Sequence, residues 1–171
     1  MLELAVAIVL FILAIPTAYA AVIGAPLVLT SKSRVREIID KAEIKEGDKF
    51  YELGTGTGRV MVAVAKYSGA KVIGIELSPL FYLITILNLK INRVKKYELF
   101  LENFFKSDLR GADIIFCFLI PRTMVKLKEK FSKELELGAK VISFAFPIEG
   151  WVPYEIIRGG KKPSVYFYRT K

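Results

Sequence analysis

Eight residues decide the fold of this chain: Glu52-Leu53-Gly54-Thr55-Gly56-Thr57-Gly58-Arg59. The stretch begins at the end of a short strand-like run, residues 49–53, and ends at the start of a run to Tyr67 that has the apolar spacing of a helix. Glycines at such a turn let the backbone bend sharply and approach a ligand closely, at the carboxyl edge of a parallel sheet. The Gly-x-Gly-x-Gly spacing differs from the Gly-x-Gly-x-x-Gly of dinucleotide binders. The stretch therefore predicts a small-ligand site in an α/β fold.

The rest of the chain continues this alternation of strands and helices. Strands are expected at 49–53, 71–76, 97–101, 113–120 and 139–146, and helices at 31–41, 58–67, 78–91 and 123–137, the last ended by Gly138. Such an alternation produces a parallel sheet. Near the end, strand patterns at 154–158 and 164–169 flank Gly159-Gly160-Lys161-Lys162, which predicts an antiparallel β-hairpin at the edge. The expected fold class is α/β, with a Rossmann-like sheet.

Two carboxylates end the first two predicted strands. Glu52 stands just before the glycine loop, where a negative charge suits a cationic ligand group and repels a pyrophosphate. Glu76 ends the second strand, where nucleoside sites of α/β proteins place the carboxylate that accepts ribose hydroxyls. Either residue alone is consistent with an ordinary surface carboxylate. Both together, with the loop between them, favour a nucleoside that carries a cationic group, such as S-adenosylmethionine.

The third predicted strand is followed by Glu102-Asn103-Phe104-Phe105. An Asn amide can hydrogen-bond the edge of an adenine, and a neighbouring Phe can cover its face. The tetrapeptide alone is equally consistent with a turn that carries core aromatics. Its position at the same edge of the sheet makes Asn103 and Phe104 candidates for the adenine site.

The N-terminus predicts a membrane anchor. Residues 4–31 contain no charged side chain, and the apolar part, 4–24, has roughly the twenty residues that a bilayer-spanning helix needs. Pro16 would kink such a helix without abolishing it. We therefore expect a transmembrane helix over residues 1–25, followed by one domain over 26–171.

The charges around that segment favour an anchor over a cleaved signal peptide. Residues 18–20, Ala-Tyr-Ala, resemble a cleavage site, but Met1-Leu2-Glu3 lacks the Lys or Arg of a signal peptide. Lys32, Arg34 and Arg36 follow the segment directly, which by the positive-inside rule predicts a single-pass protein with its domain in the cytoplasm. The net charge of +9 suits an anionic partner such as a lipid leaflet, nucleic acid or an acidic protein face.

The metal and redox chemistry open to the chain is limited. It contains no histidine and one cysteine, Cys117, so an internal disulfide is excluded and a zinc site has too few of its usual ligands. We expect no bound metal.

With these residues, the chain resembles class I S-adenosylmethionine-dependent methyltransferases. More narrowly, it resembles two groups of small protein lysine methyltransferases. One comprises broad-specificity archaeal enzymes, and the other comprises membrane-anchored mitochondrial enzymes that modify the ATP synthase c-subunit or the adenine nucleotide translocase. Residues 26–30, Pro-Leu-Val-Leu-Thr, match the family's Pro-Phe-Val-Pro-Thr, and the most distinctive stretch is 146–153, Phe-Pro-Ile-Glu-Gly-Trp-Val-Pro. The chain departs at Thr57, where relatives often carry Asp, and at Phe144 and Ala145, where they tend to be polar or charged.

The resemblance implies S-adenosyl-L-methionine as cofactor and a protein lysine as acceptor, on membrane proteins among others. The cofactor residues it implies are Thr30, Glu52, Gly54, Thr55, Gly56, Gly58, Glu76, Leu77, Asn103, Phe104 and Phe118. Deprotonating a lysine at pH 7 costs roughly 4–5 kcal/mol. An adjacent sulfonium and an apolar channel both lower the lysine pKa, so no dedicated base is required. The hypothesis for that channel is Phe118, Phe144, Pro147 and Trp151, although Phe118 and Phe144 could equally be core residues.

Two other functions fit the same residues. One is methylation of a lipid or quinone-like small molecule, and the other is a non-catalytic membrane protein that binds an adenosyl ligand. Enzymes that methylate base amines or glutamine amides carry a motif of the Asn-Pro-Pro-Tyr type after the fourth strand. Residues 118–121 are Phe-Leu-Ile-Pro instead, which argues against those two acceptors. Lysines at 126–133 and at 161–162 could hold anionic lipid or RNA, but a solvated helix face explains them better, so nucleic acid is not an expected partner.

Overall fold

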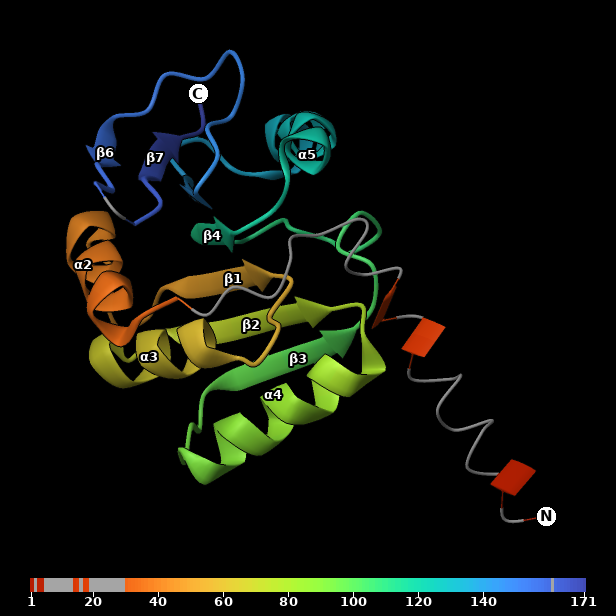
Figure 1. Ribbon diagram of the computed structural model, residues 1–171. Coiled ribbons are helices and arrows are strands. Elements are labelled where there is room, and N and C mark those ends of the chain that lie inside the picture. Colours follow the sequence, from red (N-terminus) through yellow and green to blue (C-terminus); the bar gives the residue numbers. More distant parts are fainter. Residues whose placement is uncertain (2, 5–13, 16, 19–29, 161) are drawn as a thin grey trace.

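The computed structural model describes residues 1, 3–4, 14–15, 17–18, 30–160 and 162–171. They form a seven-stranded sheet with helices on both faces (Figure 1). The elements are α2 (Lys32–Ala42), β1 (Lys49–Leu53), α3 (Arg59–Ser68), β2 (Lys71–Glu76), α4 (Pro79–Ile91), β3 (Tyr97–Leu101), β4 (Ile114–Cys117), α5 (Pro121–Glu134), β5 (Lys140–Phe144), β6 (Glu155–Ile157) and β7 (Val165–Arg169).

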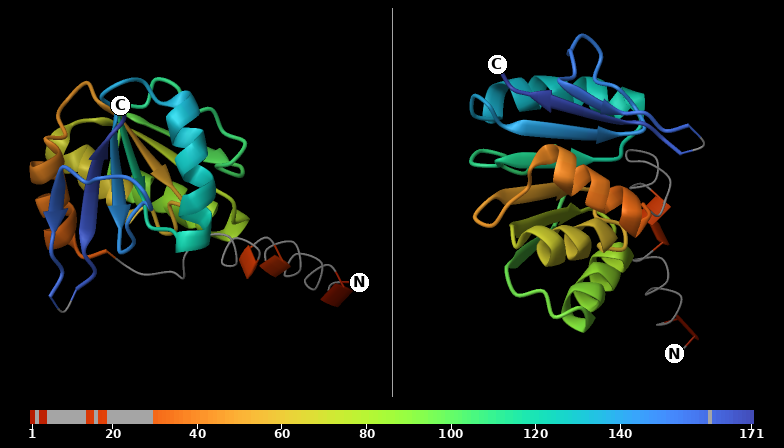
Figure 2. Two further views of the ribbon diagram at one scale, coloured as in Figure 1. Left: turned by 90° about the horizontal axis from the view of Figure 1, so that it is seen from above. Right: turned by 90° about the vertical axis from the view of Figure 1, so that its left-hand side faces the viewer.

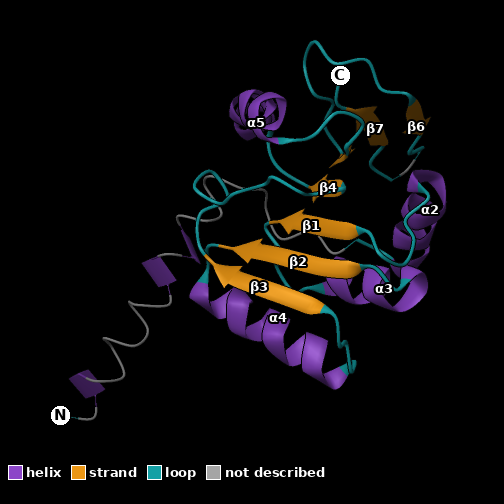
Figure 3. Cartoon of the chain, turned by 180° about the vertical axis from the view of Figure 1, so that it is seen from behind, coloured by secondary structure: helices purple, strands orange, loops and turns teal. Residues whose placement is uncertain are grey.

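The strand order across the sheet is β3-β2-β1-β4-β5-β7-β6. The first five strands are parallel, whereas β7 runs antiparallel to both β5 and β6. The predicted parallel sheet and its antiparallel C-terminal hairpin are thus confirmed. The last strand of the chain, β7, lies between β5 and β6, so β6 forms the outer edge of the sheet. Figure 3 shows β1, β2 and β3 pointing the same way, with the loops that follow them gathered at one edge.

The alternation of side chains along β4 separates two hydrophobic cores. Ile114 and Phe116 face the core under α2 and α3, while Ile115 and Cys117 face the core under α5. Figure 2 shows α5 on one side of the sheet and the other three helices on the opposite side. The side chain of a residue near a strand end therefore lies in one of these two cores, depending on the face of the sheet toward which it points.

Several predicted elements have the expected bounds because their ends carry clear signals. β1, β2 and β3 span the predicted residues. Helix α4 begins at Pro79, and the Ser78 hydroxyl caps it by accepting from Phe81 N at 3.3 Å. Ser31 caps α2 in the same way.

The predictions for β4, α5 and β5 were too long or displaced. Pro121 takes the first position of α5, where its missing N–H costs nothing, so β4 ends at Cys117 rather than at residue 120. α5 ends at Glu134, and Gly138 lies beyond it in a turn rather than at its end. β5 ends at Phe144 because Ala145 has a φ of 74°, outside the extended region.

The predicted membrane helix, residues 1–25, lies outside the described residues except at positions 1, 3–4, 14–15 and 17–18. Within the part of the chain that the structure describes, no helix has the length and apolarity needed to cross a bilayer.

Candidate active site

The glycine loop lies at the carboxyl edge of the sheet, between β1 and α3. Gly54 N donates to Ile75 O at 2.8 Å, which ties the start of the loop to β2. Gly58 N donates to Thr55 O at 2.8 Å and closes a turn. Gly54, Gly56 and Gly58 have φ values of 80°, 54° and 71°, a region that only glycine adopts without steric strain. The three glycines are therefore required by the shape of the loop.

Helix α4 supports the loop from behind. A Cβ on Gly58 would lie 2.8 Å from Thr85 Cγ2 and 3.3 Å from Thr85 Cα, so this close approach also requires glycine. Thr85 Oγ1 donates to Gly56 O at 2.9 Å, and Asn88 Nδ2 donates to Thr57 O at 2.9 Å. Neither of these two α4 residues was predicted from the sequence. Their signal was two polar side chains three positions apart in a mostly apolar helix.

Glu76 joins the loop to the end of β2. Its Oε2 accepts a hydrogen bond from Gly56 N and its Oε1 accepts one from Ser78 N, both at 2.8 Å. Burial raises the pKa of the Glu76 carboxyl, while the backbone N–H groups favour its ionised form and oppose that shift. The carboxylate is thus fixed in orientation at the edge of the sheet, and its remaining lone pairs can accept ligand hydroxyls.

Glu52 lies buried at the end of β1, on the α3 side of the sheet. Its Oε2 accepts a hydrogen bond from Met61 N at 3.1 Å, in the first turn of α3. Burial raises the pKa of the Glu52 carboxyl well above its usual range, and the charge of Glu76 raises it further. Among the described residues, no Lys or Arg forms an ion pair with Glu52. A buried carboxylate in this situation favours a cationic ligand group.

These observations fit S-adenosylmethionine. Its ammonium group would compensate the buried charge of Glu52, and its ribose hydroxyls would be accepted by Glu76. The glycine loop between the two carboxylates leaves the backbone uncovered by side chains, which allows a ligand to approach closely. Glu52, the loop and Glu76, predicted from their spacing, are indeed brought together by the fold.

The predicted adenine residues lie beyond the end of β3. Asn103 Oδ1 accepts from Phe105 N at 3.0 Å, a local turn that leaves the side-chain NH₂ as the donor toward a ligand. Phe104 is buried in the core under α5, and the half-buried Phe105 ring lies 4.8 Å from it, centroid to centroid. Of the two rings, Phe105 is the more accessible.

The other cofactor candidates occupy different environments. Thr30 is buried just before α2, Leu77 is half-buried between Glu76 and the Ser78 cap, and Phe118 is half-buried after β4. Only Leu77 therefore adjoins the glycine-loop network directly along the chain.

The structure brings together only part of the predicted acceptor channel. The Phe118 and Phe144 rings lie 4.8 Å apart, at the ends of β4 and β5, on the face covered by α2 and α3. Pro147 is exposed. Trp151 packs in the other core, under α5, with its ring 6.5 Å from Phe131 and 5.8 Å from Tyr168. Phe118 and Phe144 thus lie on one face of the sheet and Trp151 on the other, while Pro147 belongs to neither core.

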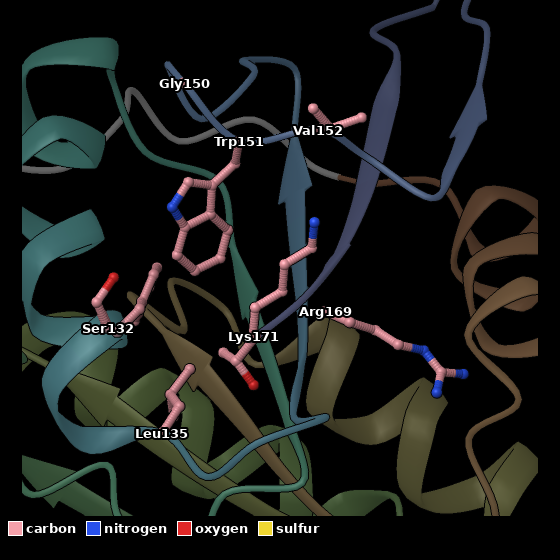
Figure 4. Close-up of a pocket in the computed structure, with 9 residues that line it drawn as sticks. Ser132, Leu135, Gly150, Trp151, Val152, Arg169 and Lys171 are labelled. Carbon is pink, nitrogen blue, oxygen red and sulfur yellow. The ribbon is translucent and has the colours of Figure 1, made fainter.

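Trp151 also borders a cavity of about 260 Å³ between α5 and β7. Its indole lines this space together with Leu135, which follows α5, and Lys171 at the C-terminus (Figure 4). None of the predicted cofactor residues lines the cavity. It is therefore separate from the carboxylates and the glycine loop.

Cys117 is a core residue rather than a nucleophile. Its side chain is buried beneath α5, and burial raises the pKa of the thiol to about 12. Among the residues that the structure describes, no cluster of three or more His, Cys, Asp and Glu side chains could hold a metal ion.

Comparison with known proteins gives a consistent result. The family described as the ANTKMT methyltransferase domain matches residues 52–155. A protein-lysine N-methyltransferase of Saccharolobus islandicus is 32% identical over 148 residues, covering 84% of this chain and 92% of that protein. The adenine nucleotide translocase lysine N-methyltransferase of Mus musculus is 28% identical over 138 residues, covering 79% of this chain but only 59% of that longer protein.

A solved structure shares the same fold. The RNA methyltransferase of Salinibacter ruber, crystallised with S-adenosyl-L-homocysteine, superposes with a TM-score of 0.80 at 28% sequence identity. The alignment covers 83% of this chain and 93% of that protein. The bound S-adenosyl-L-homocysteine in that structure agrees with the ligand that Glu52 and Glu76 fit here.

Proposed function

Because this chain belongs to the ANTKMT methyltransferase domain family of S-adenosylmethionine-dependent protein-lysine methyltransferases, we propose that it transfers methyl groups to lysine side chains of proteins. The observation that carries the proposal is the similarity to a protein-lysine N-methyltransferase along 92% of that enzyme's length. The buried carboxylate pair that flanks the glycine loop supplies the cofactor site that this reaction needs.

S-adenosylmethionine supplies an electrophilic methyl group on a sulfonium. The residues of this chain bind and orient the reactants, which is the main requirement of an in-line displacement. We assign the cofactor ammonium to Glu52 and the ribose to Glu76, with Asn103 donating to the adenine. The hydrogen bonds from Thr85 and Asn88 hold the loop between them in one shape.

The acceptor side rests on apolar side chains. We propose that Phe118 and Phe144 line the approach of the acceptor lysine, and that Pro147 and Trp151 belong to the segment that bounds it. An apolar wall lowers the pKa of a lysine ammonium, and the lysine can therefore lose its proton without a dedicated base. Trp151 would act by holding this segment against α5, through its contacts with Phe131 and Tyr168.

We also propose that the enzyme is anchored to a membrane. The support is the uncharged run at residues 4–24, followed by Lys32, Arg34 and Arg36. Carbonate extraction should leave the full chain in the membrane pellet. Protease added to sealed cytoplasm-side-in vesicles should then leave the domain intact, and domain cleavage would contradict the cytoplasmic orientation.

The acceptor can be tested by supplying methyl-labelled S-adenosylmethionine and a cell extract to the purified protein. The label is then measured in the protein, RNA and lipid fractions. We expect label in protein, absent with Glu76→Ala, and no enzyme-dependent label in RNA or lipid. Label in lipid alone would move the assignment to a small membrane substrate, and label in RNA alone to the reaction named for the Salinibacter ruber enzyme. No label in any fraction would favour the non-catalytic alternative.

A further inference from the structure

The outer face of α4 carries a continuous apolar stripe. Leu80, Leu83, Leu87 and Ile91 are 40%, 52%, 60% and 77% exposed. Their spacing of three or four residues places them on one side of the helix, over about three turns. Single exposed leucines are common, but a contiguous stripe of this length indicates a surface that contacts something.

The other long surface helix shows how unusual this face is. The outer side of α5 is dominated by charged and polar residues, among them Arg122, Lys126 and Lys133, and Val125 is its one large exposed apolar residue. On α4, Lys90 is the single charged residue of the thirteen. Figure 1 shows α4 at the periphery of the molecule beside the edge strand β3, so no other described element covers this side.

The charges within α4 and in the turn that follows it all have one sign. From residue 77 to residue 97 the chain contains no Asp or Glu, whereas Lys90, Arg93 and Lys95 are exposed at the C-terminal end of α4. None of these three cations forms an ion pair within the described part of the chain. An apolar stripe with cations beside it matches the surface of an anionic bilayer, which offers acyl chains and negative headgroups together.

The start of α4 also contacts the uncharged N-terminal segment. Thr17 Oγ1 lies 2.6 Å from Ser78 Oγ, the residue that caps the helix. In that segment the described side chains Leu4 and Ile15 are themselves exposed. The capping residue of α4 is therefore in contact with a described residue of the uncharged segment.

We propose that the stripe formed by Leu80, Leu83, Leu87 and Ile91 lies on the surface of an anionic lipid bilayer, with Lys90, Arg93 and Lys95 against the headgroups. A second copy of the chain fits less well. A symmetric contact between two α4 helices would bring the same acid-free segment against itself and would bring Lys90, Arg93 and Lys95 close to their own copies. The proposal concerns docking of the folded domain and holds for any acceptor molecule.

Docking by this face would fix where the chemistry occurs. Ser78 caps α4, and Ser78 N donates to the Glu76 carboxylate, so the carboxyl edge of the sheet adjoins the start of the stripe. Acceptor lysines close to the bilayer surface would then be within reach, while those on distant parts of a protein would not.

Site-specific fluorescence on the full chain tests this contact. Leu83 and Val125 make a matched pair, because they are 52% and 53% exposed on α4 and α5 respectively. Each is changed to Cys and labelled with an environment-sensitive dye, since the native Cys117 is buried and its thiol pKa is raised to about 12. The probes are vesicles of phosphatidylcholine with phosphatidylglycerol, with and without nitroxide-bearing lipid.

With the chain bound to these vesicles, we expect a blue shift and several-fold stronger nitroxide quenching for the dye at position 83 than at position 125. Equal, water-like emission at both positions would overturn the proposal, because the chain would then be attached through its N-terminus alone. A concentration-dependent shift at position 83 without vesicles would also overturn it and would identify a second copy as the occupant.

A charge-insertion pair provides an independent readout. With the dye placed at Leu80→Cys and the chain bound to vesicles, Leu83→Glu with Leu87→Glu should lower the nitroxide quenching several-fold, whereas Val125→Glu should not. Methyl transfer measured in detergent should be unchanged in both, so failure of docking is distinguishable from failure of the catalytic assignment. Equal quenching with and without these substitutions would contradict the contact.

Discussion

The proposed cofactor site and the proposed acceptor channel of this enzyme are built differently. Glu52, the glycine loop and Glu76 come from consecutive elements, and α4 adds the hydrogen bonds of Thr85 and Asn88 to the same network. The proposed channel residues come from the end of β4, from β5 and from the segment after β5, with Phe118 and Phe144 on one face of the sheet and Trp151 on the other. The first region is polar, buried and held by directional bonds, whereas the second depends on aromatic packing.

This difference determines how each region tolerates change. Buried polar networks lose function when a single partner is removed, because the groups left behind are unpaired. Apolar surfaces accept substitutions of similar volume at little cost. We therefore expect cofactor binding to be the constant property of this fold, and the aromatic residues to determine which acceptor is used.

The largest effect is expected from Gly58→Ala. The new Cβ would lie 2.8 Å from Thr85 Cγ2, and the alanine would have to adopt a φ of 71°. Affinity for S-adenosylmethionine should fall about 100-fold or more, and the free energy of unfolding by about 2–4 kcal/mol. Calorimetric titration and urea denaturation measure the two quantities.

Gly138→Ala is the matched control for that substitution. Gly138 also has a positive φ, 87°, but a Cβ there would meet nothing within 4 Å. It should lose only about 1–2 kcal/mol of stability and keep its affinity for the cofactor. Equal effects of the two substitutions would show that the contact with Thr85 does not shape the site.

Glu52→Gln should have opposite effects on binding and on stability. Burial raises the pKa of Glu52, so the folded chain holds this proton more tightly than the unfolded chain, whose carboxyl has its usual pKa near 4.5. The stability of the ligand-free wild type therefore decreases as the pH rises from that range through the raised pKa. Gln removes this contribution, so the variant should be about 1–3 kcal/mol more stable at neutral pH, yet bind S-adenosylmethionine at least about tenfold more weakly.

Thermal unfolding across pH tests the expected gain of stability in Glu52→Gln, and calorimetric titration tests the expected loss of cofactor affinity. The control is Glu98→Gln, an exposed carboxylate on β3 paired with Lys71 at 2.5 Å, which should change stability by less than about 1 kcal/mol. Unchanged cofactor affinity in Glu52→Gln would remove Glu52 from the site.

On the acceptor side, Phe118→Ala and Trp151→Ala should separate turnover from stability. Phe118 lies beside Phe144 at the sheet edge, and its loss should lower kcat about tenfold with little change in cofactor affinity. Trp151 packs on Phe131 and Tyr168, and its loss should cost about 3 kcal/mol of stability, with a smaller effect on kcat. If Trp151→Ala is stable but inactive, Trp151 contacts the acceptor; if it keeps full turnover, Trp151 has no part in the channel.

The smallest expected effect is a gain of stability from Ala145→Gly. Ala145 has a φ of 74° immediately after β5, a conformation that costs an L-residue with a side chain about 1–2 kcal/mol. Part of this is offset by the greater freedom of glycine in the unfolded chain, so a net gain of about 0.5–1 kcal/mol is expected in urea denaturation. Ala139→Gly, at a buried site just before β5, should be destabilising instead, and a loss of stability in Ala145→Gly would contradict the assigned strain.

The sequence predicted the positions of the glycine loop, Glu52 and Glu76 well because their signals are local. The glycine spacing, the carboxylates at two strand ends and the Ser78-Pro79 cap are each readable within a few residues. The parallel sheet then brings the strand ends to one edge without further information.

What the sequence could not provide depends on contacts between distant elements. The role of Thr85 and Asn88 follows from the packing of α4 behind the loop; the sequence shows their polarity and spacing but not the carbonyl groups that they bind. The separation of Trp151 from Phe118 depends on which face of the sheet the segment after β5 crosses. The ends of β4 and α5 were misplaced because the continuous apolar run hid the start of the helix at Pro121.

The most direct test of the central claim is the chemical identity of the methylated residue. An acceptor protein labelled by the purified enzyme is hydrolysed to amino acids, and the labelled product is identified by mass spectrometry. The account predicts N-methylated lysine, formed by the wild type and by Gly138→Ala but not by Gly58→Ala. Label in another amino acid, or labelled lysine formed equally by Gly58→Ala, would contradict it.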